Sequence, residues 1–531
     1  MSPDSREADA MAVDLPAPVA VEVAHWLREV LPAGGELRGD SRAVRAGDAF
    51  FALPGRRDDG RKHVAEALAR GAVAVVYESD GAARLETDGL PARAVTGLRE
   101  LAGHIASEFH GRPSERLRLV AVTGTNGKTT TTQWIANGLH RMGRRSAVVG
   151  TLGSGVAGEL AGTGLTTPDA LALQALLARF AESGVDVVAA EASSIGIDQG
   201  RLNGAQVEVA VFTNLSRDHL DYHGTMHDYA NAKARLFGWP GVRTTVVNGD
   251  DPHCTLMAAA QARDSRPRCI GYGLSPGQHG LKFDAALVAE RVYDAGHGIV
   301  ATIGGDFGSA ELRLPMLGAF AVSNALAVAA SWLALGIPFE QAIGALQRLA
   351  PVPGRMEALD APHSPAVVVD YAHTPDALAT VLAALRPVAM RRGGQLWCVF
   401  GAGGERDAGK RPMMGAAVEN GADRLVITND NPRGETPFRI ISDIRAGLTR
   451  EPELCEPDRA AAIRAAIGRA SPEDVVLIAG KGHETTQEVA GELLPFSDRA
   501  HALAALAARA GAGEPSGAGA PSGGQEGGAS V

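Results

Sequence analysis

Short apolar runs rich in β-branched residues alternate with amphipathic stretches along most of the chain. Such runs are typical of buried parallel strands, and they occur at 118–123, 146–150, 186–191, 207–214 and 244–248. A second series follows at 366–371, 395–401, 424–428 and 474–479. Strands that alternate with helices predict βαβ units, so we expect an α/β protein built on doubly wound sheets.

Interruptions in this alternation predict three domains. Before residue 115, short strands at 48–53 and 72–76 mix with helices around 21–30 and 64–70. Pro351, Pro353 and Gly354 interrupt helical sequence and mark a second boundary. A length of 531 residues also requires several cores. We therefore expect domains at 16–115, 116–351 and 352–510, between disordered ends at 1–15 and 511–531, the latter rich in Gly, Ala and Ser.

Composition limits the class of protein. With 45% hydrophobic and 21% charged residues and no apolar run long enough to span a bilayer, the chain is expected to be globular, without membrane insertion. Its start lacks a secretory signal, which predicts a cytoplasmic location. The net charge of -10 argues against nucleic acid as the main partner. Four distant cysteines are expected to be reduced thiols: Cys254, Cys269, Cys398 and Cys455.

A glycine-rich turn follows the strand at 118–123 and precedes a helix expected from Lys128. Glycines let backbone N–H groups face phosphates, and a helix N-terminus adds positive potential. Lys128 would reach the β and γ phosphates, and the Thr129 hydroxyl would bind Mg²⁺. The loop is shorter than the usual pattern, which has a glycine where this chain has Val122. The predicted triphosphate site comprises Gly124, Thr125, Asn126, Gly127, Lys128, Thr129 and Thr130.

Acidic residues and histidines follow two neighbouring strands. Glu191 ends the strand at 186–191, where a carboxylate suits Mg²⁺ beside the phosphates. The loop after 207–214 holds Asp218, His219 and Asp221, so we place His219 in the same site. Lys233 lies on an expected amphipathic helix at 226–237, where a lysine is ordinarily a solvated surface residue.

Several segments together resemble the Mur ligases, in the family's order over roughly residues 38–500. They are the loop at 124–130, Asn214-Leu-Ser-Arg-Asp-His-Leu-Asp-Tyr-His223, Pro353-Gly-Arg-Met-Glu357, Asp370-Tyr-Ala-His-Thr-Pro-Asp376 and Gly480-Lys-Gly-His-Glu484. The resemblance implies a three-domain Mur ligase architecture, with a central phosphate-loop sheet and a Rossmann-like C-terminal domain. It is narrowest to members that use ATP and Mg²⁺ to add meso-2,6-diaminopimelate to UDP-N-acetylmuramoyl-L-alanyl-D-glutamate in peptidoglycan precursor synthesis.

The resemblance also implies roles for individual residues. Lys128 matches a catalytic position, as do the metal-site residues Thr129, Glu191, His219 and Lys233. Lys233 matches a lysine that the family carbamylates to N6-carboxylysine, whose added carboxylate can bind or support Mg²⁺. Uridine-nucleotide and muramoyl-dipeptide contacts are implied for Ser41, Thr166, Thr167, Ser193, Gln199 and Arg201. Asp370 and His373 are candidates for the base and ribose of ATP. The implied diaminopimelate pocket comprises Arg406, Asp430, Asn431, Pro432, Arg433, Gly480 and Glu484.

The pocket chemistry fits diaminopimelate, whose distal end carries both a carboxylate and an ammonium group. Arg433 can clasp the carboxylate with two parallel hydrogen bonds, and Glu484 can pair with the ammonium. L-lysine lacks the distal carboxylate and would leave Arg433 without a partner. Two positions depart from the family pattern: Ile195, where members often have His, and Ala321, where they often have Asn.

Other functions stay open at this point. Arg433 argues against an L-lysine-adding sister ligase, and the first domain, with Asp40-Ser-Arg42, argues against a folylpolyglutamate-type ligase. A GTPase-like switch would need an Asn-Lys-x-Asp motif, which the chain lacks, and a scaffold leaves the polar loops at strand ends unexplained. We expect a monomer in which the D-glutamyl γ-carboxylate attacks ATP to give an acyl phosphate, which the amine of diaminopimelate then attacks. The third domain would close on the second to exclude water.

Overall fold

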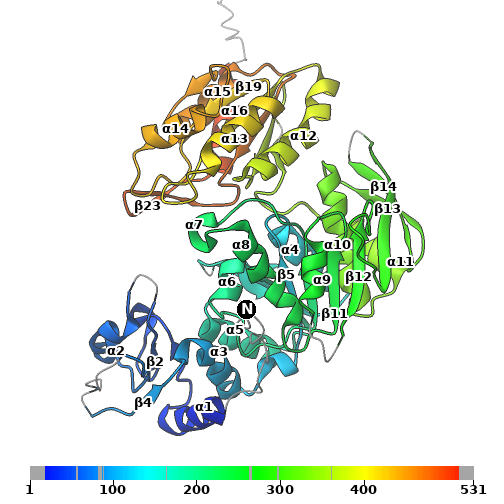
Figure 1. The fold of residues 1–531 in the computed structure, drawn as a ribbon. Coiled ribbons are helices and arrows are strands. Elements are labelled where there is room, and N and C mark those ends of the chain that lie inside the picture. Colours follow the sequence, from blue (N-terminus) through cyan, green and yellow to red (C-terminus); the bar gives the residue numbers. More distant parts are fainter. Residues whose placement is uncertain are drawn as a thin grey trace, which may run out of the picture. The chain divides into compact units, whose positions relative to one another are not determined.

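The computed structural model describes residues 18–512 except 56–57, 82–86, 88, 163, 262–265, 296–297 and 360. The predicted disordered end at 1–15 lies outside this range, as does almost all of the predicted tail at 511–531. Two compact units are present, Met1–Val352 and Pro353–Val531. Both are α/β, as Figure 1 shows, which confirms the predicted fold class.

The first unit begins with a four-stranded parallel sheet in the order β1-β2-β3-β4. Its strands are β1 (Leu37–Arg38), β2 (Ala49–Ala52), β3 (Ala74–Glu78) and β4 (Ala92–Val95). Helices α1 (Pro18–Val30) and α3 (Leu98–Phe109) pack together in its apolar core, whereas α2 (Val64–Ala69) contributes to a second, smaller cluster. Helices α1 and α2 and strands β2 and β3 agree with the sequence prediction, whereas α3, β1 and β4 were not predicted.

An eleven-stranded sheet forms the rest of the first unit, in the order β15-β14-β13-β12-β11-β10-β5-β9-β6-β7-β8. Its parallel part contains the predicted strands β5 (Arg118–Thr123), β6 (Ser146–Gly150), β9 (Val187–Glu191), β10 (Val209–Phe212) and β11 (Thr244–Asn248). The other strands were not predicted: β7 (Gly153–Val156), β8 (Glu159–Ala161), β12 (Arg268–Gly273), β13 (Ala285–Asp294), β14 (Ile299–Gly305) and β15 (Ala310–Leu314).

Alternate residues of the central strand β5 face opposite sides of this sheet. Helices cover both sides. Val120 and Val122 join one core cluster, while Leu119 and Ala121 join the other. The first cluster holds α4 (Lys128–Arg141), α10 (Ala319–Ala334) and α11 (Phe339–Leu346), and the second holds α5 (Ala170–Glu182), α6 (Ser194–Asp198), α8 (Met226–Ala234) and α9 (Cys254–Ala259).

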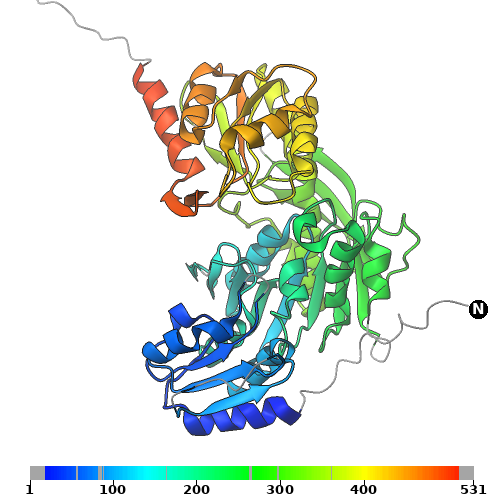
Figure 2. The ribbon, with the colours of Figure 1, turned by 60° about the vertical axis from the view of Figure 1, so that its left-hand side comes forward.

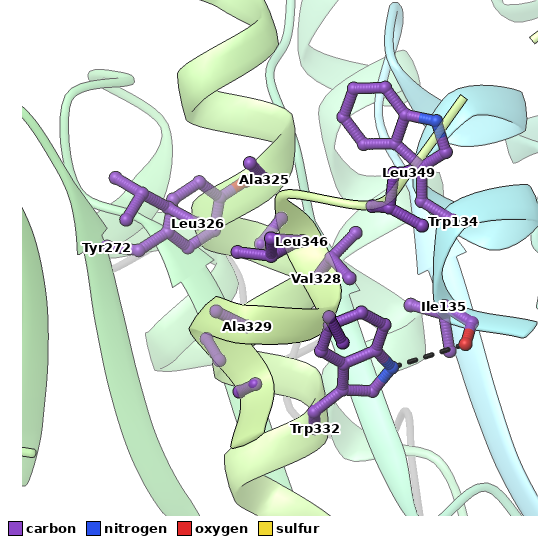
Figure 3. Close-up of a cluster of buried hydrophobic side chains, with 14 of the residues drawn as sticks. Trp134, Ile135, Tyr272, Ala325, Leu326, Val328, Ala329, Trp332, Leu346 and Leu349 are labelled. Carbon is purple, nitrogen blue, oxygen red and sulfur yellow. Dashed lines mark hydrogen bonds between the residues drawn. The ribbon is translucent and has the colours of Figure 1, made fainter. Parts of the chain in front are cut away.

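The contact between α4 and α10 fixes the helix that follows the glycine-rich turn. Trp332 of α10 is fully buried, and its indole N–H donates to the Ile135 carbonyl of α4 at 3.2 Å (Figure 3). A Cβ at Gly138 would overlap the same indole ring, so α4 and α10 approach closely at this position. The helix that supports the turn is therefore anchored by a rigid aromatic contact.

The second unit contains a six-stranded sheet in the order β16-β17-β21-β18-β19-β20. Its strands are β16 (Glu357–Leu359), β17 (Ala366–Asp370), β18 (Leu396–Phe400), β19 (Arg424–Ile427), β20 (Leu454–Cys455) and β21 (Val475–Ala479), and a separate hairpin joins β22 (Thr486–Val489) to β23 (Glu492–Pro495). Its helices are α12 (Pro375–Arg392), α13 (Lys410–Gly421), α14 (Pro437–Arg445), α15 (Arg459–Arg469) and α16 (Asp498–Ala512). Figure 2 shows α16 in red at the edge of this unit, where it packs on α15.

Two further features concern the class of protein. Among the described helices, none has the length and apolar character needed to cross a membrane. All four cysteines are free thiols, and burial raises the pKa of Cys254, Cys269, Cys398 and Cys455.

Candidate active site

The glycine-rich turn joins β5 to α4, as predicted, and its backbone has a shape that only glycine accepts. Gly124 has φ 149° and Gly127 has φ 85°. A Cβ at Gly127 would lie 2.6 Å from Asn324 Oδ1, and one at Gly124 would overlap the Thr213 hydroxyl. Glycine is required at both positions because any side chain would be strained and would also collide with a neighbour.

The segment after β10 holds the turn in place. The N–H of Asn126 donates to Asn214 Oδ1 at 2.9 Å, and Asn214 Nδ2 donates back to the Asn126 carbonyl at 3.1 Å. The N–H of Thr125 donates to the Asn214 carbonyl at 2.8 Å. Asn214 was part of the family resemblance, but its bracing role required the structure. The turn is thus preorganised by its neighbour strand.

Two lysines meet at the first glycine of the turn. Lys128 Nζ donates to the Gly124 and Thr125 carbonyls, both at 2.9 Å, and Lys233 Nζ donates to the Gly124 carbonyl at 2.7 Å. The Lys233 side chain is 1% exposed and its ammonium lies 4.5 Å from the centre of the Tyr229 ring. The structure therefore buries Lys233 at the phosphate loop instead of leaving it on a solvated surface.

Burial lowers the pKa of Lys233 well below its ordinary value, and the nearby Lys128 ammonium lowers it further, while Asp218 opposes the shift. Both lowering effects favour the neutral amine, because removing a cation from water and placing it near another cation are unfavourable. A neutral amine is the form of lysine that acts as a nucleophile.

Glu191 lies directly beside Thr129, which supports the predicted metal site. Thr129 Oγ1 donates to Glu191 Oε2 at 3.1 Å, and the Thr151 N–H and hydroxyl donate to the same carboxylate at 2.8 and 3.1 Å. Glu191 is 1% exposed. Its hydrogen-bond donors in the described chain are neutral hydroxyl and amide groups. A buried carboxylate and a hydroxyl are suitable oxygen ligands for Mg²⁺. Thr151 was not predicted, because it follows β6 and the sequence around it does not reveal its contact with Glu191 at the end of β9.

His219 lies beside Asp218 and Tyr229, and its contact with a metal stays a prediction. Its Nε2 is 3.5 Å from Asp218 Oδ2, and its ring centroid is 6.2 Å from that of Tyr229, whose ring also faces Lys233. Its backbone is left-handed, with φ 53°. Within the described residues, no three or more His, Cys, Asp or Glu side chains form a ready-made metal cage. Thr129 and Glu191 are thus the predicted metal ligands that contact each other directly.

The residues predicted to hold the muramoyl-dipeptide form one network next to Glu191. Thr167 Oγ1 donates to the Glu191 carbonyl at 2.7 Å and lies 3.0 Å from Ser193 Oγ. Arg201 donates to the Thr167 carbonyl at 2.7 Å and to Gln199 Oε1 at 2.8 and 3.1 Å. Burial lowers the pKa of Arg201. Thr166 joins through the Thr151 hydroxyl at 3.0 Å.

Three other positions in the first unit can be located. Ser41 lies in the four-stranded part and donates to Glu66 Oε2 at 2.8 Å, outside the network around Glu191. Ile195 is half-buried on α6, and Ala321 is buried near the start of α10. The two departures from the family pattern are thus accommodated as apolar packing residues.

In the second unit, Asp370 ends β17 and His373 lies just after it. The Asp370 carboxylate accepts the N–H groups of Met356 and Ala372, both at 2.8 Å, and burial raises its pKa. His373 Nδ1 lies 2.8 Å from the Tyr371 carbonyl, a distance at which the ring N–H donates. Asp370 thus ties the residue before β16 to the segment after β17, and contact of Asp370 or His373 with ATP stays a prediction.

The predicted amino-acid pocket is assembled from the ends of β18, β19 and β21. A Cβ at Gly480 would lie 2.5 Å from Asp430 Oδ2, and one at Gly403 would lie 3.1 Å from Arg433 Nη1 and 3.6 Å from Arg406 Cγ. A Cβ at Gly404 would overlap the carbonyl oxygen of Pro432. Asn431 Nδ2 donates to Glu484 Oε2 at 3.0 Å. The structure therefore brings together Arg406, Asp430, Asn431, Pro432, Arg433, Gly480 and Glu484.

Two charged residues that the sequence did not single out complete this cluster. Lys481 is fully buried, and its ammonium donates to Glu484 Oε2 at 2.6 Å and to Asn431 Oδ1 at 2.9 Å. Glu488 Oε2 lies 3.0 Å from Arg433 Nε. The expectation that Arg433 lacks a partner unless the substrate supplies a carboxylate was therefore wrong. Lys481 could have been found inside the Gly480–Glu484 motif, whereas Glu488 is revealed only by hairpin pairing.

A buried ion pair fixes the strand ends that carry this pocket. Arg459 and Asp498 are both fully buried and lie 2.7 Å apart. Arg459 also donates to the carbonyls of Asn429 at 3.0 Å and Ala479 at 2.9 Å, just after β19 and at the end of β21. The guanidinium thus ties α16 to both strand ends.

Three family models match in order: "Mur ligase family, catalytic domain" over residues 36–110, "Mur ligase middle domain" over 122–332 and "Mur ligase, glutamate ligase domain" over 354–482. A UDP-N-acetylmuramoyl-L-alanyl-D-glutamate--2,6-diaminopimelate ligase of Acidovorax sp. (strain JS42) is 48% identical, covering 92% of this chain and 97% of its own. A protein of the same name from Pseudomonas aeruginosa is 48% identical, covering 89% and 95%.

Solved structures are similar to this chain over most of its length. That of a UDP-N-acetylmuramoyl-L-alanyl-D-glutamate--2,6-diaminopimelate ligase has a TM-score of 0.60 and 36% identity, covering 90% of this chain and 95% of its own. MurF from Acinetobacter baumannii, at 20% identity and a TM-score of 0.63, covers 92% and 98% and shares the fold. The ordered family models and an identity of 48% over nine tenths of the chain show that this protein belongs to the Mur ligase family.

Proposed function

We propose that this chain is the ATP-dependent ligase that adds meso-2,6-diaminopimelate to UDP-N-acetylmuramoyl-L-alanyl-D-glutamate in peptidoglycan precursor synthesis. Relatives that match nearly its whole length carry this activity in their names. The observation that carries the proposal is the contact between Thr129 and Glu191 next to a turn that two lysines approach. This arrangement provides the groups that phosphoryl transfer requires.

Each domain would hold one substrate. Residues 16–115, with Ser41, would bind the uridine nucleotide, residues 116–351 would bind ATP, and residues 352–510 would bind diaminopimelate. Asp370 and His373 would contact the base and ribose of ATP. We also propose that the protein acts as a monomer in the cytoplasm, where ATP is available, without nucleic acid or membrane insertion. Elution as a dimer during size-exclusion chromatography would contradict the monomer.

Lys128 and the N–H groups of residues 124–130 would bind the phosphates, because they lie at the N-terminus of α4. Thr129 and Glu191, with His219 and the carbamate of Lys233, would hold Mg²⁺, which would supply positive charge beside the phosphate oxygens. Arg201 and Ser193, with Thr166, Thr167 and Gln199, would orient the D-glutamyl γ-carboxylate toward the γ-phosphorus. Its attack would release ADP and give an acyl phosphate.

The second step would take place at the pocket of the second unit. Arg433 and Arg406 would hold carboxylates of diaminopimelate, and Glu484 would pair with its distal ammonium. The neutral amine at the other end would attack the acyl carbon, so that the amide forms and phosphate leaves. Enclosing the acyl phosphate would protect it from water.

Lys233 would carry the carbamate that the family resemblance implies. Its lowered pKa supports this proposal, because CO₂ reacts with the neutral amine and not with the ammonium ion. The product is an anion next to Lys128, so a neutral amine would become a group that attracts the Lys128 ammonium.

Two alternatives differ in the amine that is added. An L-lysine-adding ligase would have no substrate carboxylate for Arg433. A folylpolyglutamate ligase is favoured less, since a folylpolyglutamate synthase of Mycobacterium tuberculosis, at 19% identity, covers 77% of this chain and supports the fold alone.

The deciding experiment measures phosphate release from ATP and the uridine-linked dipeptide with meso-diaminopimelate, with L-lysine or with no amino acid. We expect release only with meso-diaminopimelate. Equal rates with L-lysine would make the pocket assignment wrong, and release without any amino acid would contradict a ligase. A matched Glu191→Gln variant should lose Mg²⁺-dependent release, while Glu159→Gln, an exposed acid on β8, should not.

A further inference from the structure

We propose that Glu488 competes with the substrate for Arg433: its carboxylate occupies the guanidinium until the distal carboxylate of diaminopimelate replaces it. The proposal rests on the assignment of this pocket to diaminopimelate given above. It differs from that assignment in making recognition an exchange of one carboxylate for another, between a side chain of this protein and the distal end of the substrate.

Backbone pairing places Glu488 next to Arg433. The Arg433 N–H donates to the Glu488 carbonyl at 3.1 Å, and the Ala490 N–H donates to the Arg433 carbonyl at 2.8 Å. The strand β22 thus runs alongside the turn after β19, with Arg433 paired to Val489. Arg433 itself has a left-handed backbone, with φ 52°. The close approach of the two side chains is therefore set by the main chain and not by chance contact of two surface residues.

The hydrogen bonds of Arg433 show which part of its guanidinium the substrate would need. Nη1 donates to the Gly404 carbonyl at 2.8 Å, and Nε pairs with Glu488 at 3.0 Å. No hydrogen bond to Nη2 is found within the described part of the chain. A carboxylate is bound most strongly through two adjacent guanidinium nitrogens. Since Nη1 is held by the main chain, the available pair is Nε and Nη2, and Glu488 occupies half of it.

The two side chains differ in exposure, so Glu488 is the one that can move away from the pair. Glu488 is 37% exposed and can rotate into water, whereas Arg433 is 18% exposed and stays in the pocket. A carboxylate that leaves for water keeps most of its solvation, so its release is inexpensive. Lys481, which pairs with Glu484, is fully buried and has no comparable route to water. Glu484 is 28% exposed, but Lys481 Nζ and Asn431 Nδ2 both donate to its Oε2, at 2.6 and 3.0 Å, so it is held more firmly than Glu488.

Under this exchange, only an amino acid with a distal carboxylate gains hydrogen bonds from Arg433. A substrate with a distal carboxylate replaces Glu488 and gains two hydrogen bonds to Arg433. A substrate without one cannot replace Glu488, so Arg433 stays neutralised and contributes nothing to its binding. The presence of Glu488 lowers the affinity for the correct substrate somewhat, and it also keeps a half-buried cation paired when the pocket holds no amino acid.

The test compares Glu488→Gln with the wild-type full chain in the phosphate-release assay, varying meso-diaminopimelate. We expect the KM for diaminopimelate to fall about two- to fivefold, the range that an exposed ion pair contributes, with kcat and the KM for ATP nearly unchanged. Glu492→Gln, which removes the same charge from the other strand of the hairpin, should leave all three constants unchanged. Glu488→Asp, which keeps the charge, should restore a KM near that of the wild type.

An active Glu488→Gln enzyme whose KM for diaminopimelate is unchanged or raised would overturn the inference and leave the proposed function intact. An equal fall in KM for Glu492→Gln would also overturn it, because the effect would then come from net charge. A wild-type enzyme that releases no phosphate in response to diaminopimelate would overturn the proposed function and the inference with it.

Discussion

The ammonium nitrogen of Lys233 lies 2.7 Å from the carbonyl oxygen of Gly124, the same oxygen that accepts from Lys128 at 2.9 Å. Two cationic groups therefore converge on one atom of the phosphate loop, in a place where Lys233 is almost fully buried. Such an arrangement is unfavourable for two ammonium ions. It becomes favourable if one of them is neutral or is converted to an anion.

Replacing Lys233 by arginine tests this conversion. Arginine stays protonated and forms no carbamate, so Lys233→Arg should lower phosphate release about 10- to 100-fold, the range for losing a group that supports a metal site. With ¹³C-labelled CO₂, nuclear magnetic resonance should detect a carbamate in the wild type but not in the variant. Lys282→Arg, at an exposed lysine, is the matched control and should retain both the signal and the activity.

The lowered pKa of Lys233 also predicts the pH dependence of carbamate formation. A lower pKa means that more of the amine is neutral at any given pH, so the carbamate should be half-formed at a lower pH than on an exposed lysine. Titration of the labelled carbamate against pH measures this midpoint. A midpoint equal to that of a free lysine side chain would contradict the burial argument.

Gly127 offers a test of the phosphate loop that separates backbone strain from collision. Gly127→Ala places a Cβ 2.6 Å from Asn324 Oδ1 at φ 85°, whereas Gly143→Ala, at φ 80° just beyond α4, has nothing within 4 Å. Both variants should lose about 1–3 kcal/mol of stability from the left-handed backbone. Only Gly127→Ala should also raise the KM for ATP, by at least about tenfold, since it displaces the loop. Equal values of KM in the two variants would exclude the collision.

The phosphate loop and the parallel strands could be predicted because their signals are local: Gly124 and Gly127 stand between an apolar run and a helix. The partners of the charged residues could not. Lys233 lies on a short helix whose sequence does not reveal burial, and Glu488 meets Arg433 only because a hairpin pairs with a distant turn. The same holds for the antiparallel strands β13, β14 and β15, whose pairing depends on tertiary contacts more than on their own residues.

The Arg459–Asp498 pair should behave as a buried salt bridge in a double-mutant cycle. Arg459→Met leaves the Asp498 carboxylate buried and unpaired, so it should destabilise the protein by about 3–5 kcal/mol. The double variant Arg459→Met with Asp498→Leu should recover most of this stability. Both variants should have a raised KM for diaminopimelate, because neither holds the carbonyls of Asn429 and Ala479 in place. Urea unfolding and the phosphate-release assay measure the two effects. Additive losses of stability would contradict the pairing.

His110, at the end of α3, makes part of the stability depend on pH. Burial lowers the pKa of His110 to about 4, with a smaller contribution from Arg179, and its Nε2 has no hydrogen-bond partner within the described residues. The unfolded chain takes up this proton near the ordinary histidine pKa of about 6.5. Between these two values the unfolded state binds more protons than the folded state, so stability falls as the pH is lowered from about 6.5 to about 4.

His110→Gln should therefore lose less stability than the wild type between pH 7 and pH 4, by at most about 3 kcal/mol. Urea unfolding at pH 7, 5.5 and 4 gives the free energies, and the comparison between the two proteins removes the contribution of carboxylates that titrate in both. His25→Gln, at an exposed histidine on α1, is the control and should follow the wild type. If His110→Gln and the wild type lose the same stability on acidification, the proton is not excluded from His110 in the folded state.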